Sequence, residues 1–162
     1  NKGKVEDSRS LSPLESLPAV LPNYQLRFNH RGGFGNIQPV GAATDGAPRE
    51  VHGVLHRLSF GDYCKLAAME HEYRPVPVQA HPYGGGEAVT AMAFITPPQR
   101  TIRPGLPPPD RYLKLLQTGA AEWPLDASYT AWLSGLSGVP SAKRGDEYYQ
   151  SCEGEPLPGW PK

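Results

Sequence analysis

The segment 50–81 changes its hydrophobic period twice, and this change limits the folds open to the chain. Residues 50–58 place apolar and polar side chains on alternate faces, which predicts a strand. Residues 59–70 then follow helical spacing, with Ser59 placed to cap the helix. Residues 74–81 return to a β-like pattern. A strand, a helix and a second strand therefore follow one another in a short piece of chain.

Further strands are predicted on both sides of this segment. Residues 24–29 alternate between apolar and polar side chains, and a weaker strand is expected over 40–43. Residues 88–95 come after a run of three glycines and are expected to form a hairpin with 74–81. Two prolines in 74–81 cannot donate to a sheet, so we expect that strand at an edge.

Two helices are predicted toward the C-terminal end. Pro108 or Pro109 is placed to open a helix that runs to a glycine stop at Gly119. Residues 125–136 carry an apolar stripe at helical spacing and form the second helix. Strands, a helix, strands and then helices indicate the α+β class with a curved sheet.

By its length of 162 residues the chain holds one domain, which we place at 23–137. Residues 1–22 are polar and broken by prolines, and are expected to be an extended arm. Residues 138–162 are expected to be a tail rich in proline and glycine. Polar termini of this kind are usually disordered alone, so we expect protein partners to contact both of them.

The bulk composition excludes several classes of partner. Sixteen basic residues balance sixteen acidic ones, which argues against nucleic acid. No apolar run approaches the roughly 20 residues that span a bilayer. Cys64 and Cys152 are far apart and are expected to be reduced thiols. His52 and His56 share a strand face without a matching ligand, so we expect no metal and no cofactor.

Residues 12–35 approach a strand through three prolines and leave it through the glycine-rich turn 32–36. This sequence pattern resembles the second strand and following loop of the γ-glutamylcyclotransferase-like (AIG2-like) family. Residues 107–121 are similar to the family's proline-led helix, and 125–136 to its terminal helix. The resemblance implies a curved mixed sheet or small barrel with two or three packed helices.

The same resemblance points to Glu70 as a catalytic residue. Residues 66–70 are similar to the family's helix that ends in a buried glutamate, with Tyr73 following before a strand. His71 stands where the family usually has glycine, and the spacing to Tyr73 is shorter than usual. Glu72 is therefore a rival for the catalytic position. The alternative is that both acids are solvated at a helix end.

The family's chemistry is the closure of a γ-glutamyl amine to 5-oxoproline, with release of an amine. The substrate's own amine is the nucleophile, so the protein supplies a carboxylate that takes a proton and later returns one. The resemblance implies substrate contacts from Tyr112, Gly33 and Tyr73. For Tyr112 the alternative is an ordinary tyrosine in an amphipathic helix stripe.

The family's tyrosine-glycine-serine-asparagine turn, which holds the γ-glutamyl group, does not occur in this sequence. The resemblance places it just before Asn1, so we expect that it lay upstream in a longer precursor, is supplied by another segment, or was lost. Two functions follow. We expect a non-catalytic accessory subunit docked by its termini in a larger assembly, such as a membrane complex of a plastid or mitochondrion. The alternative is an active cyclotransferase with Glu70 as general acid and base.

Overall fold

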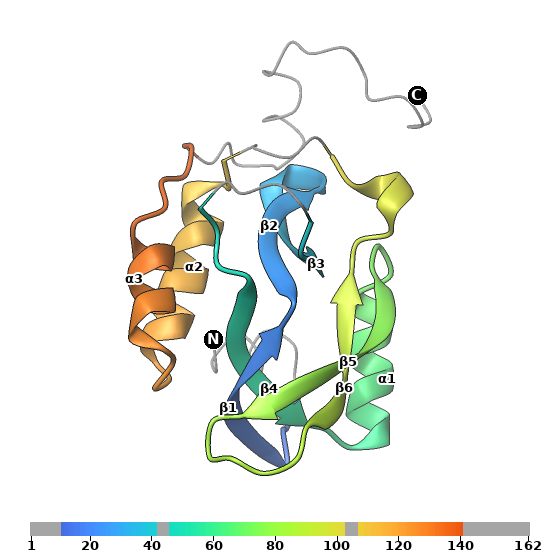
Figure 1. The fold of residues 1–162 in the computed structure, drawn as a ribbon. Helices are drawn as coiled ribbons and strands as arrows, with labels where there is room; N and C mark the ends of the chain where they lie inside the picture. Colours follow the sequence, from blue (N-terminus) through green and yellow to red (C-terminus); the bar gives the residue numbers. More distant parts are fainter. Residues whose placement is uncertain (1–10, 42–45, 103–106, 141–162) are drawn as a thin grey trace.

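A computed structural model describes residues 11–41, 46–102 and 107–140, and Figure 1 shows its arrangement. The strands are β1 (Glu15–Pro22), β2 (Tyr24–His30), β3 (Phe34–Pro39), β4 (Glu50–Arg57), β5 (Arg74–Pro82) and β6 (Val89–Ile95). The α-helices are α1 (Phe60–Met69), α2 (Asp110–Ala121) and α3 (Ala127–Ser134). Two short 3-10 turns, η2 (Arg31–Gly33) and η3 (Pro98–Arg100), follow β2 and β6.

The strands form two antiparallel sheets that together curve into a half-barrel. The larger sheet has the order β4-β1-β5-β6, and β2 pairs with β3 in the smaller one. At the seams between them, β2 lies against β4 and β3 lies against β6. In Figure 1, α2 and α3 lie on one side of the strands and α1 on the other. The mixed α+β architecture predicted from the sequence is confirmed.

The prediction of an extended arm over 1–22 is wrong for Glu15–Pro22, which form β1 inside the larger sheet. β1 pairs with β4 over its whole length and with β5 at Ala19 and Val20. Ala19 and Leu21 are buried, so this proline-containing strand has a face that packs into the interior. The polar residues near it in the sequence made that strand pattern hard to recognise. Residues 1–10 lie outside the described part of the chain.

The strand predicted at 40–43 is displaced, because the chain reverses earlier than expected. Gly32 and Gly33 have positive φ angles of 79° and 67°, a conformation that glycine adopts without steric cost. They complete the turn η2, and β3 starts at Phe34, inside the stretch expected to be the turn. The N–H of Val40 donates to the Asn23 carbonyl at the open end of the β2–β3 hairpin. Residues 42–45 are not described.

The edge position predicted for β5 is wrong for the strand as a whole, since β5 lies between β1 and β6. Its pairing with β6 runs from Arg74 to Ala80, whereas its pairing with β1 is limited to His81 and Pro82. Pro75 and Pro77 therefore lie in the part of β5 for which the described pairs are with β6 alone. The curvature of the sheet makes this possible, because it separates β1 from that part of β5.

All three predicted helices form. Ser59 caps α1, its Oγ accepting from the Asp62 N–H at 3.1 Å. Gly119 does not end α2 as predicted. It lies buried inside the helix, which continues to Ala121. With Ala120 it gives α2 a small-residue surface, which suits close helix packing. α3 is shorter than the predicted 125–136, because Asp126 caps it.

The described core joins α2, α3 and β2. Leu113, Ala120 and Leu133 are its buried centre, and the partly buried side chains packed on it are Leu26, Phe28, Leu116, Leu125, Trp132 and Leu136. After α3 the chain returns to the start of α2, where Val139 exchanges backbone hydrogen bonds with Asp110 and Pro108. The predicted tail thus begins as a docked segment, and residues 141–162 are not described. Within the described residues, no helix is long and apolar enough to cross a membrane.

Candidate acid–base site

The two glutamates singled out from the sequence lie in the tight turn between α1 and β5. Glu70 is the last capping residue of α1, and its N–H donates to the Leu66 carbonyl at 3.0 Å. The N–H of Tyr73 then donates back to the Glu70 carbonyl at 2.9 Å. This compact turn accommodates the short spacing between Glu70 and Tyr73. It also brings Glu72 close to both of them.

A buried histidine that the sequence analysis did not identify lies at the centre of this site. His30 ends β2 with its side chain only 6% exposed, and its ring stacks on Tyr73 with centroids 4.2 Å apart. Its Nε2 is 3.5 Å from Glu72 Oε2, and its Nδ1 is 3.0 Å from Thr96 Oγ1. Arg31 Nη1 is 3.7 Å from the other Glu72 oxygen. The Glu72 carboxylate is therefore shared between an imidazole and a guanidinium.

Burial and the neighbouring carboxylates shift the pKa of His30 in opposite directions. Burial lowers the pKa of His30 from its ordinary 6.5, while the carboxylates of Glu72 and Glu70 act to raise it. Arg31 adds a smaller lowering influence. Glu72 is the direct contact of the ring, and Glu70 lies two residues before it in the same turn. Tyr73 completes this group by stacking on the ring.

The side-chain amides of Asn36, Asn29 and Gln38 form a hydrogen-bonded chain that adjoins the site at Thr96. The backbone N–H of Thr96 donates to Asn36 Oδ1 at 2.9 Å. Asn36 Nδ2 donates to Asn29 Oδ1, and Asn29 Nδ2 donates to Gln38 Oε1, each at 2.9 Å. A backbone N–H has no alternative orientation, so it determines which way Asn36 points and, through Asn36, the other two amides. The hydroxyl that contacts His30 thus belongs to a residue that this network holds in place.

Tyr112 and Gly33 belong to the packing of β3 against the start of α2. The Tyr112 hydroxyl accepts the Gly35 N–H at 3.0 Å, and its ring lies edge-on between Phe28 and Phe34. A Cβ built on Gly33 would lie 3.1 Å from the Pro107 carbonyl oxygen, so the backbones approach closely there. Their contact with a substrate stays a prediction.

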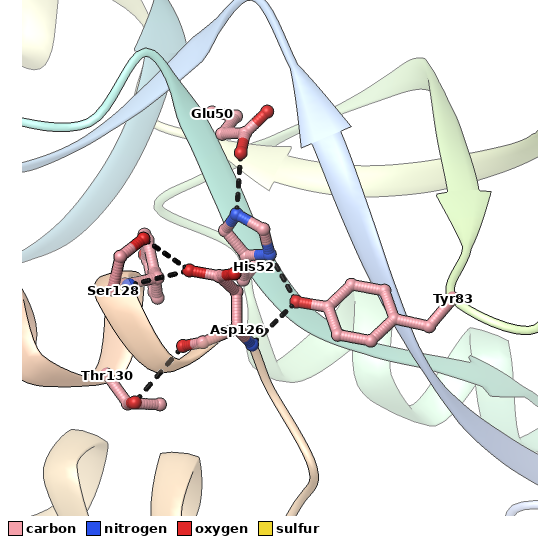
Figure 2. Close-up of polar contacts among 7 residues, drawn as sticks. Glu50, His52, Tyr83, Asp126, Ser128 and Thr130 are labelled. Carbon is pink, nitrogen blue, oxygen red and sulfur yellow. Dashed lines mark hydrogen bonds and ion pairs between the residues drawn. The ribbon is translucent and has the colours of Figure 1, made fainter.

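A second polar cluster, shown in Figure 2, joins β4 to the start of α3. His52 Nε2 lies 2.9 Å from Glu50 Oε1, and His52 Nδ1 is hydrogen-bonded to the Tyr83 hydroxyl. That hydroxyl also accepts the Asp126 N–H at 3.0 Å. Asp126 caps α3 and accepts from Ser128. We call Glu50, His52, Tyr83 and Asp126 the α3 clamp.

The α3 clamp is enclosed on one side by Tyr129, whose ring lies 4.8 Å from that of His52. Burial raises the pKa of Tyr129 and also that of Tyr83, so both phenols stay protonated near neutral pH. In sequence, only the spacing of Glu50 and His52 on one strand face hints at this cluster. Among the described residues, no group of three or more His, Cys, Asp or Glu side chains is placed to hold a metal ion.

No protein-family model and no curated protein sequence matches the chain. Several solved structures match the chain in fold. A structure named gamma-glutamyl cyclotransferase is 16% identical with a TM-score of 0.68, over 93% of this chain and 90% of that one. An uncharacterized protein from Homo sapiens is 18% identical with a TM-score of 0.66, over 83% and 81%. YkqA from Bacillus subtilis is 21% identical with a TM-score of 0.59, over 75% of this chain and 45% of its own.

At these identities the likeness shows the fold. The half-barrel with its three helices is a γ-glutamylcyclotransferase-like fold, as the resemblance in the sequence implied.

Proposed function

We propose that the chain carries the acid–base part of a γ-glutamyl cyclotransferase site, which converts a γ-glutamyl amine into 5-oxoproline and a free amine. The supporting observation is that Glu72 lies 3.5 Å from the buried imidazole of His30, with Glu70 two residues before it in the same turn. Both glutamates belong to a fold similar to that of a structure named gamma-glutamyl cyclotransferase.

The reaction needs a group that moves one proton twice. The substrate's α-ammonium first loses a proton to a carboxylate, and the amine nitrogen then attacks the γ-carbonyl carbon. A new C–N bond closes the five-membered ring, the original amide C–N bond breaks, and the proton passes to the leaving amine. A carboxylate placed beside the substrate's α-amine nitrogen, which becomes the nitrogen of the new ring, performs both transfers. The ring closes within one molecule, so positioning supplies much of the rate.

Glu70 is the carboxylate that we assign to proton transfer. Glu72 is the alternative, and its two partners, His30 and Arg31, bind it in place. Tyr112 is assigned to the substrate carboxylate. Its phenol oxygen accepts the Gly35 N–H. Gly33 and Tyr73 are assigned to the substrate's surroundings.

The test uses the natural full-length protein with γ-glutamyl-alanine and with glutathione, scored for 5-oxoproline. We expect Glu70→Gln to reduce kcat by about 10²-fold or more, because it removes the proton acceptor and keeps the shape. Glu72→Gln is expected to lose less. If the wild-type protein and Glu70→Gln both matched buffer, the proposed activity would be wrong.

A non-catalytic accessory subunit is the second candidate. The observation that favours it is the pairing of Glu72 with both His30 and Arg31, which commits one of the two carboxylates to holding the turn. Partners would contact the terminal regions within 1–22 and 138–162, in an assembly such as an organellar membrane complex.

Native mass measurements on the protein from its source test this candidate. The accessory role predicts a large assembly from which the protein is released when residues 1–10 and 141–162 are deleted. A monomeric natural protein would contradict it.

A further inference from the structure

His30 is placed to do more than fill space between β2 and the turn after α1. A buried neutral imidazole has one donor and one acceptor nitrogen, and each needs a partner. Thr96 Oγ1 lies 3.0 Å from Nδ1, whereas the partner at Nε2 is a charged carboxylate, that of Glu72, 3.5 Å away. The orientation of the ring is also fixed by Tyr73, which stacks on it at an interplanar angle of 18°.

We propose that His30 is a positioning residue of the acid–base site: it shares a proton with Glu72 as a coupled pair, and so assigns the proton-transfer role to Glu70. This rests on the proposed function. The Nε2 atom of His30 faces the Glu72 carboxylate. When the ring takes a second proton, it becomes a cation beside two carboxylates.

The groups that face the ring determine the sign of the effect. The two carboxylates, Glu72 and Glu70, follow α1, Arg31 is the neighbouring cation, and the Tyr73 phenol stacks on the ring. From the end of β6 the contact is the neutral hydroxyl of Thr96. A protonated His30 favours the ionised form of both carboxylates, so it keeps the base competent as the pH falls. Loss of His30 removes this favourable charge from the site at low pH.

The first arm of the test needs no activity. We follow the ring protons of His30 by NMR across pH in the wild-type protein, Glu72→Gln and Glu70→Gln. We expect the pKa of His30 to fall in both variants and to fall further in Glu72→Gln, because Glu72 is the direct contact. An unchanged His30 titration in Glu72→Gln would overturn the coupling.

The second arm is the pH profile of 5-oxoproline release. His30→Gln keeps hydrogen-bonding groups but cannot be protonated, so the acid limb of kcat/KM should move up by about one pH unit. The exposed His81→Gln is the matched control and should change neither readout. An acid limb that stays in place would refute the positioning role. A wild-type protein without activity would instead refute the proposed function, while the NMR arm still decides the coupling.

Discussion

Gly35 and the Tyr112 hydroxyl meet so closely that each determines what the other position tolerates. The Gly35 N–H donates to the Tyr112 oxygen, and a Cβ on Gly35 would lie 2.6 Å from that oxygen. The phenol ring makes edge-to-face contacts with Phe28 and Phe34, so a shift of the ring would disturb both contacts. Glycine is needed here for space, since its φ is not positive.

A double-mutant cycle tests this contact. Gly35→Ala should lower the free energy of unfolding by about 1–3 kcal/mol, as overpacking does. Tyr112→Phe should cost about 1 kcal/mol for the lost hydrogen bond. Because Tyr112→Phe also removes the clashing oxygen, the double variant should cost less than the sum, as measured by urea unfolding. Gly53→Ala is the control, since its Cβ meets nothing within 4 Å. Strict additivity would mean that the two groups do not collide.

At the scale of elements, α3 is attached to the barrel by polar contacts as well as by its apolar stripe. Tyr129 and Leu133 bury against the interior, and Asp126 caps the first turn. The α3 clamp adds a link from the cap through Tyr83, at the end of β5, to His52 on β4 (Figure 2). A helix of eight residues gains little from its own backbone, so such tertiary links determine whether it forms.

Tyr83→Phe removes this link while keeping the ring. We expect it to cost about 1–2 kcal/mol, because the Asp126 N–H and His52 Nδ1 both lose their partner. Amide exchange in the first turn of α3 should quicken more than exchange in α1. Gln79→Ala, which breaks an exposed side-chain bond to Thr90, serves as the control and should stay within about 0.5 kcal/mol. Equal losses from both variants would argue against the clamp.

At the scale of the whole molecule, the half-barrel is joined at one seam by side chains. β3 and β6 lie side by side, and the N–H of Thr96, the residue after β6, donates to Oδ1 of Asn36 on β3. Asn36 is 3% exposed, and its amide continues the network through Asn29. The same seam supports the hydroxyl that contacts His30. The Asn36 amide therefore links this seam to the candidate acid–base site.

Asn36→Ala should open this seam. It leaves the Thr96 N–H and Asn29 Oδ1 buried without their partner, at a cost of about 3 kcal/mol in total. Hydrogen exchange should rise together at the ends of β3 and β6 and in the turn that carries Glu72. The exposed Gln99→Ala is the comparison and should leave exchange unchanged. A rise confined to β3 would show that the seam is not a cooperative unit.

From the sequence alone, the β4–α1–β5 order, the β5–β6 hairpin and the helices near the C-terminus were predictable. Each of these rests on local signals: the period of apolar residues, the Ser59 cap and the prolines before α2. The same local signals located Glu70, Glu72 and Tyr73 at the end of a helix. The resemblance to the γ-glutamylcyclotransferase-like family also predicted the fold that the structural comparisons show.

Only the tertiary structure decided which distant segments meet. β1 was mistaken for an arm because pairing with β4 and β5 supplies its hydrogen bonds, and no local pattern records that pairing. His30 joins the candidate acid–base site through contacts with Glu72, Tyr73 and Thr96, which lie far along the chain. Burial and opposing charges, the two influences on its pKa, arise only when those segments pack together.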